Sequence, residues 1–271
     1  MVTSPQIATS NALIPSHLPR NLTAIFIGAT NGIGETTLRE FARFTKRLAP
    51  NVIFVGRAQE AGERIARECK SLNADGEFTF LKADVGLLKG VDEGTLQTGV
   101  ETEEGPSKII AFRGHGASMA TLTMEHLAKQ YPNVSFIHDF PGPVKSGIAR
   151  GPGVGMMIMR FMGSILGPMM NIPLEESGRR HVYLCTSARY PPKAEDKSSA
   201  VPLGEGLLIA KGTDALVGSG VYTVDEHLES GDEKVDAVLA SLRREGMTEK
   251  VWKDAESEFV RITGKTKIQV G

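Results

Sequence analysis

The feature that most constrains this chain is a glycine-rich turn between an apolar run and a helix-like segment. The apolar run over residues 24–27 ends directly at Gly28, and a helical pattern begins at Ile33. A strand, a tight turn and a helix N-terminus in this order direct backbone N–H groups and the positive end of the helix dipole at an anion. Side chains in place of the glycines would obstruct a bound diphosphate or the packing of strand against helix. The pattern predicts a phosphate-binding turn; the alternative is a tight turn without a ligand. The predicted binding residues are Gly28, Thr30, Asn31, Gly32, Ile33 and Gly34.

Strands and helices alternate through the first third of the chain. The expected strands cover residues 23–27, 51–55 and 77–82, and the expected helices cover 33–47 and 59–72. A βαβαβ series of this kind is the repeating unit of a doubly wound parallel sheet. We therefore expect an α/β, Rossmann-like fold with a parallel sheet between two helical layers.

The rest of the sequence continues as one domain over residues 1–271, without an internal repeat or a clear linker. The Ser-, Pro-, Asn- and Thr-rich residues 1–20 are expected to be flexible, and residues 232–263 to form C-terminal helices. An exposed loop is expected at 193–200. Further elements are expected as a helix at 117–130, a strand at 134–138, a helix at 175–187 and two hairpin-like strands at 207–209 and 221–224.

Charge and cysteine content exclude several kinds of partner. The net charge of −1 provides no field for nucleic acid or anionic lipid. The two cysteines, Cys69 and Cys185, have no spacing typical of a metal site or a disulfide framework, and no other metal-ligand cluster is visible. The N-terminus has no apolar core of a signal peptide, so we expect a cytoplasmic protein.

A methionine-rich segment over residues 151–170 is about as long as a membrane span. Arg160 lies in its middle, where a charge is costly in lipid, and Gly-Pro pairs interrupt it. Flexible thioethers suit an adaptable apolar surface. We therefore favour a lid over an apolar small-molecule substrate, spanning residues 144–177. A core or dimer helix and a membrane contact are the alternatives.

Three motifs in order resemble the short-chain dehydrogenase/reductase family. They are the turn at 28–34, Asp84 with Val85 after the third strand, and Pro141 to Val144 after a later strand. The amino-acid sequence at residues 140–147 and 186–190 is similar to that of a fungal branch of the family linked to specialised metabolism. The resemblance implies that the glycine turn holds a pyrophosphate and that Asp84 contacts adenine. It also implies that Pro141, Gly142 and Val144 meet the nicotinamide.

The end of the second strand favours NADP(H) over NAD. A carboxylate there binds the ribose hydroxyls of NAD, whereas a cation accommodates the 2′-phosphate of NADP. This chain has Gly56 followed by Arg57, whose guanidinium can bind a phosphate bidentately. The alternative is a solvated surface arginine at position 57.

The resemblance breaks at the catalytic residues, because no Tyr followed four positions later by Lys occurs in the chain. Matching the helix before the late strand puts His115 at the tyrosine position and Met119 at the lysine position. Imidazole titrates near neutrality, so His115 could act as the proton donor. The alternative is a loop histidine between two glycines. His138 and Asp139 are a second candidate pair, with a core histidine and a turn-capping aspartate as the alternative.

The central region is also short. Residues 85–116 contain one strand-like run, at 108–112, where the family has two strands with their helices. A βαβ unit alone needs about 30 residues or more. We infer that a central sheet unit and most of the usual proton relay are absent.

Three functions remain compatible with the sequence. The first is an NADP(H)-dependent oxidoreductase acting on a carbonyl or alcohol of an apolar small molecule, in fungal secondary metabolism. The second is a catalytically impaired, nucleotide-binding relative that lacks the Tyr/Lys pair. The third is a redox-neutral enzyme that uses the same pocket. The sequence leaves open whether the chain forms a homo-oligomer.

Overall fold

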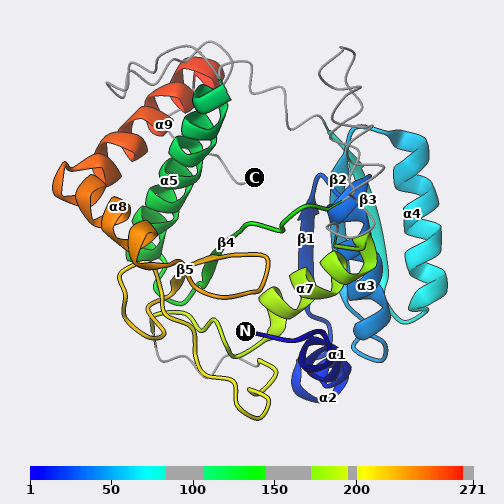
Figure 1. Cartoon of the computed structure of the whole chain (residues 1–271). Coiled ribbons are helices and arrows are strands. Elements are labelled where there is room, and N and C mark those ends of the chain that lie inside the picture. The colour runs from blue at the N-terminus through cyan, green and yellow to red at the C-terminus, as the bar shows by residue number, and fades with distance from the viewer. Residues whose placement is uncertain (84–105, 145–171, 195–199, 265–271) are drawn as a thin grey trace.

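The computed structural model describes residues 1–83, 106–144, 172–194 and 200–264 (Figure 1). The proposed lid residues 145–171, with the methionine-rich segment, fall outside these ranges, and so does Asp84.

The first half of the chain has the predicted βαβαβ order. Strands β1 (Thr23–Ile27), β2 (Asn51–Gly56) and β3 (Glu77–Lys82) form a parallel sheet in the order β1-β2-β3. Helices α3 (Gly32–Phe44) and α4 (Gln59–Leu72) connect them. The expected α/β class with parallel strands is confirmed.

Alternation along these strands builds a core on one face of the sheet. The face carries aromatic and aliphatic side chains that pack against α3, α4 and α7 (Leu174–Thr186). A carbon atom added at Gly178 of α7 would lie 2.9 Å from the Thr36 side chain, so glycine lets α7 lie close against α3. The strand residues of this core are Ala24, Phe26, Val52, Phe54, Phe78 and Phe80.

The opposite face of the same sheet is open to solvent in the structure. Ile25 and Ile27 of β1 are 65% and 67% exposed, and Leu81 of β3 is 49% exposed. Among the described helices, those that contact this sheet do so from the core face. The described residues therefore form two layers here, where the sequence analysis expected three.

The second half contains a separate parallel pair of strands. Strand β4 (Phe136–Asp139) pairs with β5 (Val221–Val224). Helix α5 (Pro106–Gln130) packs against this pair and against α9 (Met247–Thr263), and α8 (Glu233–Arg244) packs against α9 (Figure 1). The described strands thus form two sheets rather than one, as expected if central strands are missing.

The N-terminal residues fold, contrary to the expected flexible stretch over residues 1–20. Helices α1 (Ser4–Ala12) and α2 (Ile14–His17) occupy this region. Thr3 begins α1 with a capping box, a device that satisfies exposed backbone amides. Ile7 and Ile14 are buried, and α1 packs against α7. The capping box and the burial of the two isoleucines stabilise these helices despite the polar composition of residues 1–20.

Two other expectations are wrong. Residues 108–112 lie in α5 rather than in a strand, because a short apolar run does not distinguish the two. Residues 207–209 form no strand, and the strand at 221–224 pairs in parallel with β4 instead of forming a hairpin. The helix expected at 175–187 and the C-terminal helices are confirmed to within two residues.

The part of the chain that the structure describes contains no helix with both the length and the apolar character needed to cross a bilayer.

Candidate functional site

The glycine turn has the backbone geometry for which glycine is needed. Gly28 has φ +78° and Gly32 has φ +60°, in the left-handed region that other residues avoid. A carbon atom added at Gly34 would lie 2.9 Å from the carbonyl oxygen of Gly28, so the first turn of α3 lies tightly against the end of β1. The geometry agrees with the reasoning from sequence, and the binding role of these residues stays a prediction.

Backbone hydrogen bonds fix this turn to the neighbouring strand. The amides of Gly28 and Ala29 both donate to the carbonyl oxygen of Val55, at 2.9 and 3.3 Å. Ala29 is fully buried. The turn is therefore held in place by β2 as well as by β1.

The N-terminus of α3 leaves amides unengaged. The Asn31 side chain accepts a hydrogen bond from the Gly32 amide at 2.8 Å. Within the described residues, the amides of Ile33 and Gly34 donate to no protein acceptor. Unpaired amides at the positive end of a helix dipole are the usual ligands of a phosphate group.

Arg57 extends the positive character of this edge. It follows β2, is exposed, and makes no ion pair or hydrogen bond within the ranges that the structure describes. The Gly56 carbonyl beside it accepts a hydrogen bond from Ala83 at 3.0 Å, which fixes the backbone at this point. Arg57 therefore follows directly on Gly56, whose backbone lies against Thr30 of the glycine turn.

The turn after β4 contains the second set of predicted cofactor-binding residues, Pro141, Gly142 and Val144. Gly142 has φ +72°, and a carbon atom added there would lie 2.8 Å from Cβ of Glu226. The Ile172 amide donates to the Pro143 carbonyl at 2.9 Å, and Val144 forms a bridge with Ile172. This turn therefore lies against the residues that lead into α7.

Helix α7 connects the two predicted cofactor-binding turns, the glycine turn and the turn after β4. Its contact with Thr36 places it on α3, the helix that carries the glycine turn, and its leading residues contact the turn after β4. Figure 1 shows the segment after β4 running from the β4–β5 pair toward the other sheet. Both turns follow the carboxyl ends of parallel strands, where α/β folds place their ligands.

Both positions matched to the family's catalytic pair lie in α5. The backbone of His115 lies within α5, so the alternative of a loop histidine is wrong. Met119, its partner in the match to the family, is buried with Leu122, Leu239 and Val251. Met119 is therefore a core residue of the α5, α8 and α9 cluster.

His138 and Asp139 do not act as a pair. Adjacent residues of a strand point to opposite faces. His138 Nδ1 lies 3.0 Å from the Thr121 hydroxyl, whereas Asp139 Oδ2 lies 3.1 Å from Nε2 of His181. His181 was not identified from sequence, since nothing local to α7 indicates a partner at the end of β4.

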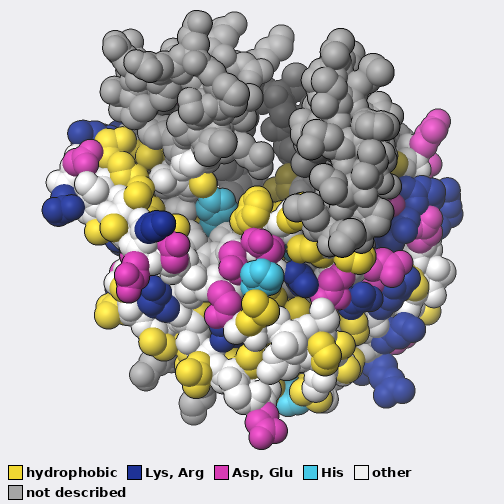
Figure 2. Space-filling view, viewed as in Figure 1, with side chains coloured by type: hydrophobic (Ala, Val, Ile, Leu, Met, Phe, Trp, Pro, Cys, Tyr) yellow, Lys and Arg dark blue, Asp and Glu magenta, His cyan; other side chains and the backbone are white. Residues whose placement is uncertain are grey.

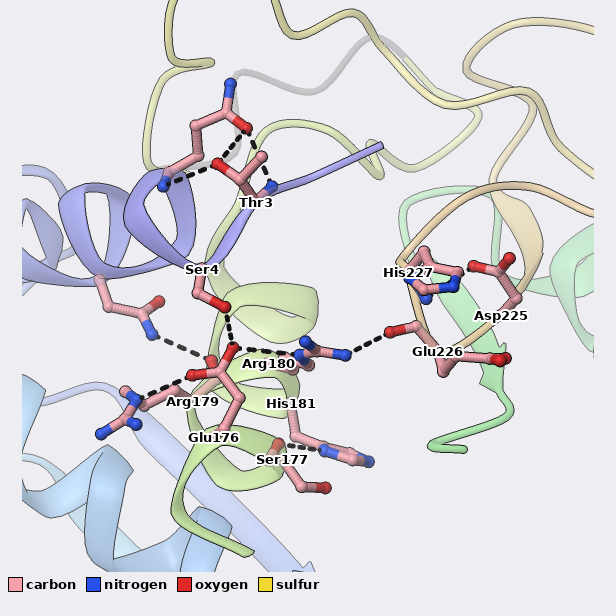
Figure 3. Close-up of polar contacts among 12 residues, drawn as sticks. Thr3, Ser4, Glu176, Ser177, Arg179, Arg180, His181, Asp225, Glu226 and His227 are labelled. Carbon is pink, nitrogen blue, oxygen red and sulfur yellow. Dashed lines mark hydrogen bonds and ion pairs between the residues drawn. The ribbon is translucent and has the colours of Figure 1, made fainter. Parts of the chain in front are cut away.

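His181 is held at both ring nitrogens. Its Nδ1 atom donates to the Ser177 carbonyl at 2.7 Å, as Figure 3 shows, and its Nε2 atom faces Asp139. Burial lowers the pKa of His181, but the hydrogen bond to Asp139, the charge of Asp139 and the Ser177 carbonyl outweigh burial and raise it. These contacts favour the charged imidazolium more than solvent does for a free histidine.

A polar network joins the N-terminal helix to the loop after β5 through α7. Glu176 accepts hydrogen bonds from Ser4 at 2.7 Å and from Arg180 at 3.2 Å (Figure 3). Arg180 also donates to the Glu226 carbonyl. Acidic and histidine side chains gather in the middle of the face seen in Figure 2, over this loop. The network helps to fix α7 relative to the β4–β5 pair.

Two cavities among the described residues lie away from the glycine turn. The cavity lined by Asp139, Ser177 and His181 has about 10 Å³, room for at most one water molecule. A cavity of about 420 Å³, lined by Lys129, Lys193 and other residues, lies at the amino end of β5.

Tyr190 is excluded as a replacement for the missing tyrosine. It is buried, its hydroxyl donates to the Leu228 carbonyl at 2.8 Å, and burial raises its pKa. Tyr190 therefore has a structural role in the core around β5.

Comparison with curated proteins finds fungal oxidoreductases. The chain is 29% identical to oxidoreductase AN1596 of Emericella nidulans, over 95% of this chain and 98% of that protein. It is 26% identical to oxidoreductase andH of Emericella variicolor, over 96% and 97% of the two chains. The resemblance to a fungal oxidoreductase branch is confirmed. No protein-family model matches the chain.

These alignments are longer than the chain itself. They extend over 334 and 335 positions, whereas the chain has 271 residues. Both relatives therefore contain residues that have no counterpart here. The expected reduction of the chain agrees with this difference in length.

Solved structures with a similar fold include L-sorbose reductase from Gluconobacter frateurii, which was determined with NADPH and L-sorbose. It is 15% identical, with a TM-score of 0.43, over 71% of this chain and 98% of that one.

Proposed function

We propose that this chain, which resembles the short-chain dehydrogenase/reductase family, binds NADP(H) and acts as an oxidoreductase on a carbonyl or alcohol group. The observation that carries the proposal is the set of unengaged amides of Ile33 and Gly34, at a helix N-terminus next to a free Arg57. The full-length relatives named as oxidoreductases support a redox activity.

The glycine turn fits the diphosphate of a dinucleotide. Main-chain amides bind phosphate oxygens only when no side chain stands between them, and the positive φ angles of Gly28 and Gly32 provide that access. The close contact at Gly34 keeps the first turn of α3 near the end of β1. These residues are therefore expected to hold the pyrophosphate.

Charge at the end of β2 supports NADP(H). Gly56 has no side chain for the ribose hydroxyls, and the neighbouring Arg57 guanidinium is available for a 2′-phosphate. NAD is the less favoured cofactor. Asp84 is expected to contact the adenine, and Pro141, Gly142 and Val144 the nicotinamide, as in the family that the chain resembles.

The bound cofactor would supply the hydride. The residues of the chain must orient the nicotinamide and donate a proton. Val144 and Gly142 lie at the carboxyl end of β4, where they would orient the nicotinamide. With no Tyr and Lys four residues apart, we propose His115 as the proton donor. The substrate is expected to be an apolar small molecule of fungal secondary metabolism, covered by residues 144–177.

A catalytically impaired nucleotide-binding protein is the second candidate. The missing Tyr/Lys pair, the two separate sheets and the greater length of the relatives favour it. Loss of a general acid typically lowers a rate by a factor of about 10²–10⁴. A redox-neutral reaction is a third, weaker candidate.

Titration of the purified chain with NADPH, followed by nicotinamide fluorescence, tests the binding proposal. Gly32→Val is expected to abolish binding, because its side chain would block the phosphate and strain the backbone. Gly246→Val is the matched control, since Gly246 also lies at a helix N-terminus with a positive φ, +70°, but belongs to the α8–α9 connection, far from the glycine turn in sequence. Wild-type protein without affinity for NADPH would refute the proposal.

Turnover separates the two leading functions. Oxidation of NADPH is followed at 340 nm with a panel of ketones and aldehydes of increasing apolar size. Activity that falls by at least tenfold in His115→Ala supports the oxidoreductase with that donor. Binding without turnover across the panel supports the impaired relative.

Location and assembly are further proposals. We expect a cytoplasmic protein without nucleic-acid partners, supported by the net charge of −1. A homo-oligomer is compatible with the exposed aliphatic face of β1. Sedimentation of the full chain at two concentrations decides this point.

A further inference from the structure

The end of β2 has no space for a side chain. A Cβ atom placed on Gly56 would lie 2.3 Å from Cγ2 of Thr30, 2.5 Å from its Oγ1 and 3.0 Å from its Cβ. Non-bonded atoms do not approach so closely in a packed interior, so any residue other than glycine requires movement here.

Neither residue has freedom to move away. The turn that carries Thr30 is fixed to β2 through the amides of Gly28 and Ala29, which share the Val55 carbonyl. On the other side, Gly56 is fixed to β3 by the hydrogen bond from Ala83. Rotation of the threonine side chain relieves little, because it is branched at Cβ and the Cβ atom itself is one of the close contacts.

This position matters for the choice of cofactor. In dinucleotide-binding folds an acidic side chain near the end of the second strand binds the ribose hydroxyls of the unphosphorylated cofactor. A carboxylate with the same backbone position as Gly56 would need the volume that Thr30 fills. Arg57, next along the chain, is exposed and unobstructed.

We propose that Thr30 closes position 56 to a ribose-binding carboxylate, so that a substitution at position 56 alone cannot open this chain to the unphosphorylated cofactor. The inference deepens the proposed function and rests on it. It assigns to Thr30 a steric role at the end of β2, separate from contact with the pyrophosphate.

The steric part is tested without any cofactor, by thermal denaturation of a double-mutant set. Gly56→Ala is expected to lower the Tm by about 5 °C through overpacking. In the Thr30→Gly background the same change is expected to cost less than half as much. Gly204→Ala is the matched control: its nearest neighbour is Leu207 at 3.8 Å, so its effect should add to that of Thr30→Gly.

The cofactor part compares the Kd values of NADPH and NADH by nicotinamide fluorescence. We expect the ratio of the two to shift toward NADH by at least tenfold in Thr30→Gly/Gly56→Asp, and to change less than threefold in Thr30→Gly alone. Gly56→Asp alone is expected to unfold at a lower temperature and to gain no affinity for NADH.

Three results would overturn the inference. They are a Gly56→Ala cost that is the same with and without Thr30, a gain of NADH affinity in Gly56→Asp alone, and a folded double variant with an unchanged ratio. Wild-type protein that binds neither nucleotide would refute the proposed function together with the selectivity, while the denaturation data would still decide whether Thr30 closes position 56.

Discussion

His181 Nε2 lies 3.1 Å from Asp139 Oδ2, which ties α7 to the carboxyl end of β4. Helix α7 packs on both sides, since Val182 lies in the core of the β1–β2–β3 sheet and Tyr183 and Leu184 lie in the cluster with β5, the partner of β4. The pair, together with Arg180 and the Glu226 carbonyl, is one of the polar links between α7 and the β4–β5 side.

This pair predicts a pH-dependent stability. The pKa of His181 is raised in the folded protein, so its contribution is fully present below its unfolded pKa of about 6.5 and is lost as pH rises through the folded pKa. Denaturation of the wild type in urea should therefore show a falling free energy of unfolding from pH 6 upward. Asp139→Asn should flatten this slope and cost on the order of 1–3 kcal/mol at pH 6. Equal slopes in the two proteins would contradict the assignment.

Burial of Ile7 predicts that the N-terminal helix contributes to stability. Ile7 is 1% exposed and packs with Tyr183 and Leu184 of α7. Ile7→Ala should destabilise the chain by about 2–5 kcal/mol in urea denaturation. Leu13→Ala is the control, because Leu13 is 39% exposed and should change little. A neutral Ile7→Ala would restore the expectation of a flexible N-terminus.

The hydrogen bonds of Arg243 are expected to stabilise the packing of α8 against α5. Its guanidinium binds both carboxylate oxygens of Glu125, at 2.9 and 2.6 Å, and the Thr213 carbonyl at 2.8 Å. Lysine cannot reproduce the bidentate geometry, so Arg243→Lys should cost on the order of 1–3 kcal/mol. The exposed pair between Lys129 and Glu249 is the comparison, and Lys129→Ala should leave the Tm unchanged. Similar effects of both changes would argue against a special role for Arg243.

Substitution by alanine is expected to have opposite effects on stability at Gly114 and at Gly34. Gly114 lies inside α5 with open space around it, so Gly114→Ala should stabilise the chain by about 0.5–1 kcal/mol. Gly34→Ala should destabilise it and weaken NADPH binding, because the new carbon meets the Gly28 carbonyl. Thermal denaturation and fluorescence titration of both variants check the pair. A destabilising Gly114→Ala would mean that residue 114 is not helical.

The sequence predicts the first half of the fold well because its signals are local. The turn at Gly28 to Gly34 and the alternating strands depend on residues close together in the chain, and the structure has them within a few residues of the expected bounds. The strand expected at 108–112 failed because a short apolar run is compatible with a helix. Parallel pairing of β4 with β5 depends on residues far apart in sequence, which no local pattern records.

The candidate site divides in the same way. The glycine geometry follows from sequence, whereas the partners of Asp139 and Gly56 do not. His181 and Thr30 meet them only through the packing of α7 and the hydrogen bonds of the turn. The roles given to Arg57, Asp84 and His115 stay predictions until binding is measured.

The uncovered side of β1 has a consequence for handling the protein. Ile25 and Ile27 present their side chains to water at 65% and 67% exposure on the same side of one strand. Exposed aliphatic side chains in such a row associate with those of other molecules, so aggregation should increase steeply with protein concentration. Light scattering of dilute and concentrated samples should reveal this stickiness, and a charged residue at position 25 should relieve it.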